Sequence, residues 1–314
     1  TLIILIMLKS NGIFLMLLGM FLFALQDALF KFLTDTQMSL FQIYSIRSFF
    51  CILTLIIIIK IFKGKVTFLK THYPFLSILR VICWFMAYTT FFVGLSIMSL
   101  ADAVTLFFVS PLFIFIFSKI LYKSVISIKS WLALFVGFVG VYILTGASFR
   151  ELDFKYLLPL FAASFYAMAM VITKITSIKD TAFQQLMHFQ LFGFILGGLI
   201  SLILSNGELN IYKNDGLIFL LKPWSPIKNI EIFYILLLAF LNLSASMSVI
   251  FAYRISDPPK IAIFEYNYLF WSICLSILIW GDFLSYNKFF GLVLIVFSGI
   301  FIIYRQNRLV KQNS

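Results

Sequence analysis

Charged side chains are scarce in this chain of 314 residues, since Asp, Glu, Lys and Arg make up only 11% of it. A water-soluble domain carries roughly a quarter charged residues. Hydrophobic residues reach 62% and the mean hydropathy is +1.07. The composition excludes an ordinary soluble domain and indicates a protein with several membrane-spanning helices.

Histidine and cysteine are also rare. The two histidines, His72 and His188, lie far apart, and the three cysteines, Cys51, Cys83 and Cys274, occupy separate apolar runs. These spacings match neither a disulfide framework nor a zinc site. Phosphate-binding, paired-histidine and nucleophile-elbow motifs are lacking as well. We therefore expect no metal site, no cofactor and no enzymatic activity.

Acidic residues are half as numerous as basic ones, with 12 against 24, which gives a net charge of +12. On a soluble protein this excess would suggest nucleic-acid binding. In membrane proteins, however, Lys and Arg gather in cytoplasmic loops. We therefore expect the lipid bilayer and a small-molecule substrate as partners, no nucleic acid, and a homodimer as an open alternative.

Long apolar runs dominate the chain. About 20 mostly apolar residues are needed for a helix to cross the hydrocarbon core, and lipid offers no partner for a backbone that is not helical. The sequence therefore predicts an all-α polytopic membrane protein with ten transmembrane helices. The expected spans are 12–33, 39–62, 74–97, 100–121, 128–147, 154–174, 183–205, 231–253, 259–280 and 286–304.

Basic residues are unevenly distributed between the loops. Most Lys and Arg fall in the alternate set of loops that shares a side with both termini, which predicts cytoplasmic termini. Abundant Phe, Ile, Leu, Lys and Asn are typical of an AT-rich genome and point to a bacterial cytoplasmic (inner) membrane. The longest external segment, 206–230, is either an interfacial piece or an ordinary ordered loop.

A weak internal repeat divides the chain into residues 1–150 and 151–314. When the chain is shifted along itself, Lys31 aligns with Lys174 and Arg47 with Gln190. Each half then holds five spans, and because five is odd the second half must insert upside down. Two inverted five-helix repeats suit alternating access to a site at the midplane between them. The second repeat carries 206–230 as an insertion.

Three segments carry a family resemblance: "DALFKFLTDTQMSLFQIYSIRSF", "GLSIMSLADAVTLFFVSPLFIFIFSKILY" and "AYRISDPPKIAIFEYNYLFWSICLSILIWGDF". The chain resembles the EamA-type branch of the drug/metabolite transporter superfamily. It departs from the family pattern after the fourth span, where Tyr122 and Lys123 replace an acidic residue, and near Tyr268, where a proline is common. The resemblance implies ten helices in two inverted repeats and a secondary transporter.

Ionisable groups in the middle of a span cost at least about 2.5–3.5 kcal/mol on insertion scales, so they usually face a bundle interior, a partner or water. In the first span, Gln26 and Asp27 are expected to face a substrate cavity. Asp27 and Lys31 lie four residues apart and are predicted to pair, either as a fixed ion pair or at the cavity wall. Arg47, in the second span, is expected to bind the Asp27 carboxylate or one on the substrate.

In the third span, Arg80, Trp84 and Tyr88 follow one another at intervals of four and share a helix face. Such an aromatic face suits a planar or cationic ligand, or it serves helix packing. We expect Arg80 to reach the cytoplasmic interface.

The ninth span holds the densest polar and aromatic cluster, with Glu265, Tyr266, Tyr268 and Trp271 as candidate substrate contacts. Glu265 is the first candidate for proton coupling or cation binding. Alternatively, Glu265 is a neutral carboxyl group that forms hydrogen bonds between helices. Asp27, Lys31 and Arg47 complete the coupling or gating set.

Three further polar residues are predicted to be structural. Asn242 and Ser246 in the eighth span are four apart and favour helix packing, and Asp102 is expected to cap the fourth span.

Carboxylates, cations and aromatic rings together favour a small cationic or zwitterionic metabolite, such as an amino acid, an amine or an S-adenosylmethionine-like compound. The alternatives are a flavin-like vitamin importer of the same fold and a non-transporting scaffold or accessory subunit.

Overall fold

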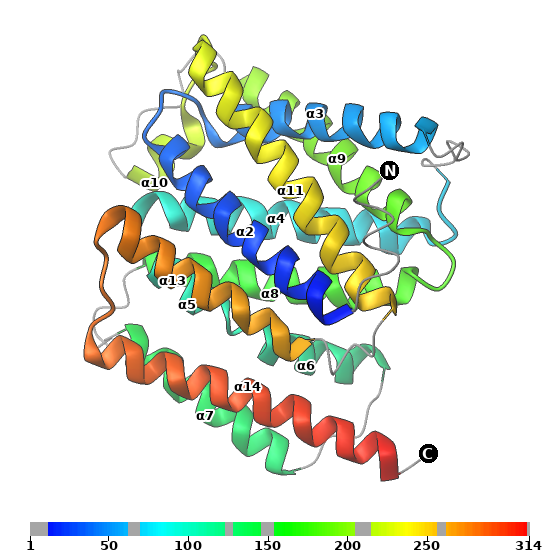
Figure 1. The fold of residues 1–314 in the computed structure, drawn as a ribbon, viewed down its shortest axis with the longest axis vertical. Coiled ribbons are helices and arrows are strands. Elements are labelled where there is room, and N and C mark those ends of the chain that lie inside the picture. The colour runs from blue at the N-terminus through cyan, green and yellow to red at the C-terminus, as the bar shows by residue number, and fades with distance from the viewer. Residues whose placement is uncertain are drawn as a thin grey trace.

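A computed structural model describes residues 12–61, 70–122, 128–145, 154–204, 215–255 and 262–312, and these residues form helices and no strands. Successive long helices run back and forth between the left and right edges of the bundle in Figure 1. In chain order the elements are α2 (Gly12–Thr34), α3 (Leu40–Ile61), α4 (Pro74–Ile97), α5 (Leu100–Phe107), α6 (Ser110–Tyr122), α7 (Ile128–Thr145), η1 (Phe154–Tyr156), α8 (Leu157–Thr176), α9 (Ala182–Ile203), α10 (Asp215–Leu221), α11 (Asn229–Ile255), η2 (Ala262–Glu265), α13 (Tyr266–Trp280) and α14 (Tyr286–Gln312).

The described residues include seven segments that are long and apolar enough to cross a membrane: Gly12–Thr34, Leu40–Ile61, Pro74–Ile97, Leu100–Ser118, Leu157–Thr176, Ala182–Ile203 and Asn229–Ala252. Shorter apolar helices cover Tyr266–Trp280 and Tyr286–Phe301. The described part of the chain is therefore helical and fits a multi-pass membrane protein, as predicted, while the count of ten spans stays a prediction.

The fourth predicted span is interrupted. Its first helix, α5, ends at Phe107, and α6 begins at Ser110, immediately before Pro111. A proline has no backbone N–H and disfavours helical geometry in the residue before it, so the break lies where the sequence would place it. The interruption leaves Phe108 and Ser110 at the wall of a cavity.

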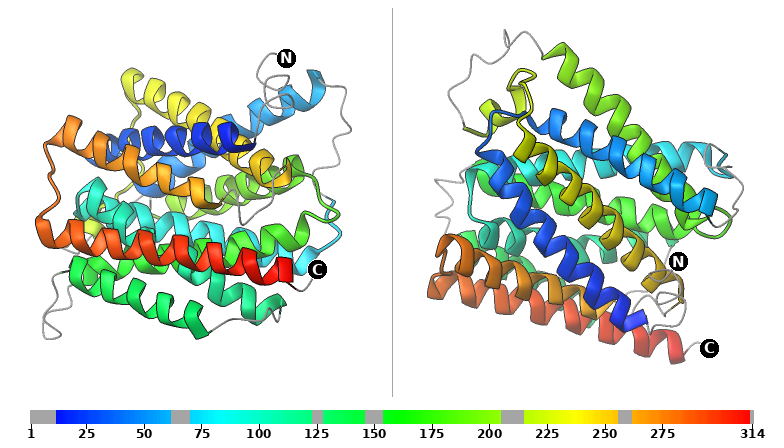
Figure 2. Two further views of the ribbon diagram at one scale, coloured as in Figure 1. Left: turned by 60° about the horizontal axis from the view of Figure 1, so that its bottom comes forward. Right: turned by 45° about the horizontal axis from the view of Figure 1, so that its top comes forward.

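Four helix pairs make the most extensive contacts: α2 with α11, α3 with α9, α4 with α8, and α7 with α14. Each joins one helix from residues 12–145 to one from 154–312. The α7–α14 pair forms a layer along one side of the bundle (Figure 2). Glycines allow close approach, because a Cβ on Gly140 would lie 2.7 Å from the Gly291 carbonyl oxygen and one on Gly19 would lie 2.7 Å from Val249.

Residues 215–230, the described part of the long segment, form an ordered structure against the end of the bundle. Phe219 of α10 is 2% exposed, with its ring 6.2 Å from that of Phe30. Lys222 Nζ donates to the carbonyl oxygen of Thr36 at 2.6 Å, and Gln42 Nε2 donates to that of Ser225 at 2.7 Å. These contacts fit the ordered-loop alternative; residues 205–214 lie outside the described part.

The start of α5 differs from the prediction. The N-cap is Ser99, whose Oγ accepts a hydrogen bond from the Asp102 backbone N–H at 3.1 Å. The Asp102 carboxylate instead pairs with Lys288 Nζ of α14 at 2.6 Å. Asp102 therefore lies in the first turn, where a carboxylate is favoured by the helix dipole, and it ties α5 to α14.

Asp180, in the loop between α8 and α9, holds the segment that precedes α4. It accepts hydrogen bonds from Thr71 Oγ1 at 2.5 Å and from the His72 backbone N–H at 3.0 Å. Burial alone raises the pKa of the Asp180 carboxyl, but the hydrogen bonds from Thr71 and His72 outweigh burial and lower the pKa below its ordinary 3.8. The ionised carboxylate therefore stabilises this loop contact.

Candidate substrate-binding cavity

A cavity of about 160 Å³ lies inside the bundle, with walls from α2, α4, α5, α6, α8, α9, α11, η2 and α13. One water needs roughly 10–15 Å³ of such space, so the cavity has room for a ligand or several waters. Most of its wall is aromatic or aliphatic, and a few buried polar groups interrupt it. This combination is typical of small-molecule sites.

A chain of hydrogen bonds crosses four helices at the wall. Gln190 Nε2 of α9 donates to Asn242 Oδ1 of α11 at 3.0 Å, and Asn242 Nδ2 donates to Gln26 Oε1 of α2 at 2.8 Å. Gln26 Nε2 donates to Asp27 Oδ1 at 2.9 Å, and the Tyr268 hydroxyl of α13 donates to Asp27 Oδ2. All five side chains are buried, so both oxygens of the Asp27 carboxylate are held in a fixed orientation.

The predicted pairing of Asp27 with Lys31 is wrong. Lys31 Nζ donates to the carbonyl oxygens of Met98 at 2.6 Å and Leu95 at 3.2 Å. These carbonyls lie at the end of α4, where the last turn leaves acceptors without helical partners. The Lys31 side chain satisfies that helix end and does not belong to the cavity wall.

The α4 face predicted from the spacing does line the cavity, since Arg80, Trp84 and Tyr88 all contribute to its wall. The Trp84 ring lies 5.2 Å from Tyr166 in a T-shaped arrangement and 5.5 Å from Phe189. The prediction that Arg80 reaches the interface is wrong, because its side chain is 2% exposed. Helix α9 packs over this turn of α4, which prevents the Arg80 side chain from extending to the surface.

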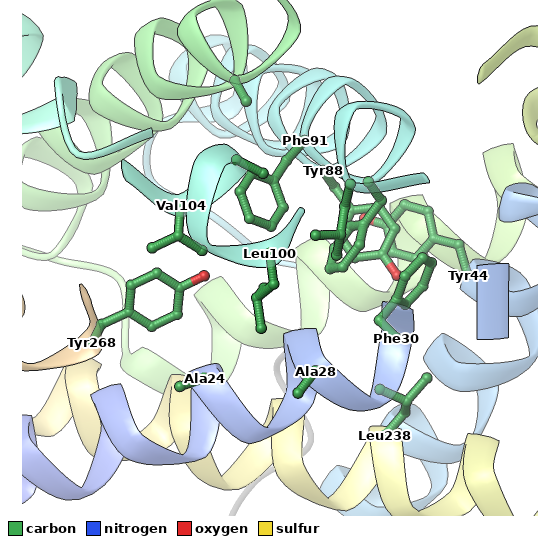
Figure 3. Packing of buried hydrophobic residues seen from close by; sticks show 14 of the residues in the cluster. Ala24, Ala28, Phe30, Tyr44, Tyr88, Phe91, Leu100, Val104, Leu238 and Tyr268 are labelled. Carbon is green, nitrogen blue, oxygen red and sulfur yellow. The ribbon is translucent and has the colours of Figure 1, made fainter. Parts of the chain in front are cut away.

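Arg47 is fully buried on α3, with 0% of its surface exposed. Its guanidinium carbon lies 4.8 Å and 4.6 Å from the ring centroids of Tyr44 and Tyr88, which Figure 3 shows gathered beside Phe30. Among the described residues no hydrogen bond reaches its three guanidinium nitrogens. The predicted carboxylate partner, Asp27, forms no ion pair with it, and aromatic faces replace the carboxylate as neighbours.

The ninth-span cluster is divided between the cavity and helix packing. Glu265 and Tyr268 line the cavity, and Tyr268 reaches from α13 into the space between α2 and α5 (Figure 3). Tyr266 packs on Phe108 at 5.3 Å, and Trp271 packs on Phe21 at 4.8 Å; neither belongs to the cavity wall. Tyr268 and Trp271 both lie in α13, where residues three apart diverge by about 60° at 3.6 residues per turn, so Trp271 turns away from the cavity.

Several cavity residues were missed or given another role. Asn242 and Ser246 were predicted to serve packing, and both line the cavity. Gln185 and Tyr166 were not singled out, although both are at the wall. Gln190, which joins the hydrogen-bond chain without lining the cavity, had a signal in the sequence, since the internal repeat aligns it with the intramembrane Arg47.

Comparisons with known proteins agree with this architecture. Residues 10–146 match the model of the EamA-like transporter family, which confirms the resemblance drawn from the sequence. The S-adenosylmethionine uptake transporter of Rickettsia prowazekii (strain Madrid E) is 26% identical over 95% of this chain and 94% of its own length. The protein of the same description from Rickettsia conorii (strain ATCC VR-613 / Malish 7) is also 26% identical, over 94% of this chain and 95% of its own.

A solved crystal structure, 15% identical, covers 95% of this chain and 97% of its own with a TM-score of 0.61. At this identity the likeness concerns the fold alone. The family match and the two Rickettsia relatives support a transporter of the drug/metabolite type and fit the expectation that the protein is not an enzyme.

Proposed function

We propose that this protein is a secondary transporter that moves a small organic cation or zwitterion across the membrane by alternating access. The observation that carries the proposal is the buried cavity, whose polar and aromatic wall is built by helices from both halves of the chain. Its Asp27 carboxylate is oriented by a chain of hydrogen bonds. A fixed carboxylate beside aromatic faces is suited to a cationic ligand.

The architecture we propose is ten transmembrane helices in two inverted repeats, 1–150 and 151–314. The helix pairing supports it. If α2 to α7 correspond in order to α8 to α14, with α10 as part of an insertion, then the contacts of α2 with α11 and of α4 with α8 are equivalent. The α3–α9 and α7–α14 pairs each join a helix to its own counterpart, as a two-fold axis requires.

The membrane and the orientation are part of the proposal and rest on the sequence. We infer a bacterial inner membrane with both termini in the cytoplasm, from the composition and from the distribution of Lys and Arg. The start of α2 and the end of α14 lie at the same edge of the bundle in Figure 1, as an even number of crossings would require. A homodimer stays an open alternative.

The substrate class we favour is S-adenosylmethionine-like. The names of the Rickettsia relatives support this class, and so does the chemistry of the cavity. A sulfonium or ammonium group would lie at Asp27, and a planar base would lie against Trp84 and Tyr166. Amino acids, amines and flavin-like compounds share part of this chemistry and are the runners-up.

Transport is proposed to be coupled to protons through Glu265 or Asp27, the carboxylates at the cavity wall. Lys31 and Arg47 would act in gating, because the half-buried Lys31 and the buried Arg47 each lie at a junction between helices and neither belongs to the cavity wall. Collapsing the pH gradient in proteoliposomes without a change in uptake would exclude proton coupling.

A non-transporting scaffold would leave no polar cavity and would turn its candidate residues to the lipid. Glu265, Trp84 and Tyr88 instead line the cavity, which speaks against that alternative. Tyr266 and Trp271, proposed as substrate contacts from sequence, would act only through packing behind the wall.

Ligand-induced thermal shifts of the purified protein test the proposal. S-adenosylmethionine is compared with S-adenosylhomocysteine, which lacks the sulfonium charge, and with riboflavin. We expect the largest stabilisation from S-adenosylmethionine, and we expect it to be lost in Asp27→Asn and reduced in Trp84→Ala. Trp224→Ala, in the loop after α10 and 40% exposed, is the matched control and should respond like the wild type. Stabilisation by riboflavin alone would favour the vitamin-importer alternative.

A further inference from the structure

Arg80 brings a positive charge to the cavity wall, and no ion pair joins it to Asp27 or Asp180. Its side chain is 2% exposed and belongs to the cavity wall. Nη2 makes one long hydrogen bond of 3.4 Å, to the backbone oxygen of Gln185. Within the described part of the chain, Nε has no hydrogen-bond partner. Arg80 thus has donor capacity that the surrounding residues do not use.

Two carboxylates, Asp180 and Asp27, are already engaged by other residues. Asp180 is engaged by Thr71 and His72, and Asp27 is engaged by Gln26 and Tyr268. No ion pair joins either of these two carboxylates to Arg80. A guanidinium taken out of water without a counter-charge is strongly unfavourable, so an anionic group from a ligand would complete this site.

The other wall group at this end also has unused capacity. Gln185 Nε2 donates to the Thr173 carbonyl oxygen at 3.1 Å and to Thr176 Oγ1 at 3.0 Å. These bonds fix the amide, and its Oε1 has no partner among the described residues. A donor on Arg80 and an acceptor on Gln185 therefore stand beside each other at the same wall.

The two charged ends of the cavity are separated along the bundle. Arg80 precedes Tyr88 by eight residues, which is about 12 Å of helix rise. The Tyr88 ring contacts Phe30 at 5.9 Å, and Phe30 lies one turn after Asp27. The Arg80 guanidinium and the Asp27 carboxylate therefore lie at different levels of the cavity wall.

We propose that Arg80 binds the carboxylate of the transported molecule, while Gln185 Oε1 accepts a hydrogen bond from the adjacent amino group. The inference rests on the function proposed above and deepens it: the substrate is an α-amino acid derivative whose second cationic group lies towards Asp27. The planar fork of arginine suits a carboxylate because it donates two parallel hydrogen bonds. Arg80 would then select carboxylated ligands over otherwise identical molecules.

The test compares binding of S-adenosylmethionine with that of its decarboxylated form, by calorimetry on purified protein. Hydrogen bonds to charged groups are worth about 1.5–3 kcal/mol, which corresponds to roughly a 10- to 100-fold change in affinity. We expect Arg80→Gln to weaken S-adenosylmethionine by this factor and the decarboxylated form by less than about threefold. Arg80→Lys, which keeps the charge, should recover part of the affinity for S-adenosylmethionine that Arg80→Gln loses.

Lys60→Gln is the matched control, because it removes one exposed basic side chain at the end of α3, away from the cavity. It should leave both affinities unchanged. If Arg80→Gln weakens both ligands equally, or neither, the assignment of Arg80 is wrong while the proposed function stands. If the wild type binds neither ligand, the proposed S-adenosylmethionine-like substrate class fails, and the assignment of Arg80 falls with it.

Discussion

Replacing Asn242 by Leu removes the central link of the hydrogen-bond chain. Asn242 accepts from Gln190 at 3.0 Å and donates to Gln26 at 2.8 Å. After the substitution, the Gln190 amide would have no partner at all among the described residues, because its Oε1 already lacks one. Gln26 Oε1 would lose its donor too, and the orientation of Asp27 would be less tightly fixed.

The expected size of the effect follows from two lost bonds. Side-chain hydrogen bonds between membrane helices average about 0.6 kcal/mol, with a maximum near 1.7. The loss of two therefore predicts a destabilisation of about 1–3 kcal/mol. Reversible unfolding in mixed micelles measures it. Ser248→Ala on the same helix is the control, because Ser248 is buried and, among the described residues, its hydroxyl donates to the Ser244 backbone oxygen within α11.

A double-mutant cycle with Gln26→Leu separates the chain from general packing. Once either partner is gone, the second substitution should cost less, so the double variant should be about 0.5–1 kcal/mol more stable than the sum of the single effects predicts. Additive effects, or an Asn242→Leu protein as stable as Ser248→Ala, would refute the reasoning that these amides act as one network.

Three further predictions concern single contacts. Tyr268→Phe removes a hydrogen bond to Asp27 and should weaken S-adenosylmethionine binding about tenfold by calorimetry; unchanged affinity would contradict the role of the hydroxyl. The Asp180 carboxyl, whose pKa is lowered below 3.8, contributes stability that is fully present above about pH 4. This contribution is lost as the pH falls through the folded-state pKa of Asp180. The melting temperature of Asp180→Asn should therefore fall less steeply with decreasing pH than that of the wild type. Equal slopes for the two proteins would exclude a stabilising role of the Asp180 carboxylate. Gly140→Ala should disrupt the α7–α14 contact and lower the melting temperature, because its Cβ would lie 2.7 Å from a backbone oxygen, whereas Gly94→Ala, with neighbours at 3.4 Å, should be tolerated.

The apolar runs predicted the helices well because lipid dictates both the length and the helical state of a membrane-spanning segment. The break before Pro111 was also within reach of the sequence, since proline limits the residue that precedes it. The α4 face of Arg80, Trp84 and Tyr88 followed from the spacing of a regular helix, and the structure places all three at the cavity wall.

The sequence could not predict which side chains on different helices bind one another. Lys31 and Asp27 are four residues apart on one helix, a spacing that allows pairing. Instead, Lys31 donates to carbonyl oxygens at the end of α4, and Asp27 accepts from a tyrosine of α13. A local spacing rule cannot weigh such alternatives, because they depend on which helices become neighbours. The same holds for Asn242, whose small size suggested packing while its amide also joins the polar network.

The most direct test of the account is uptake of labelled S-adenosylmethionine into proteoliposomes by the wild type and by Asp27→Asn. The account predicts saturable uptake by the wild type and loss of uptake in the variant, which keeps the size of the side chain but lacks the charge. The amide oxygen can still accept from Gln26, and the Tyr268 hydroxyl can turn to accept from the amide nitrogen. The thermal stability of the variant without ligand should stay close to that of the wild type. Equal uptake by the two proteins, or no uptake by the wild type, would contradict the claim that this carboxylate binds the transported cation.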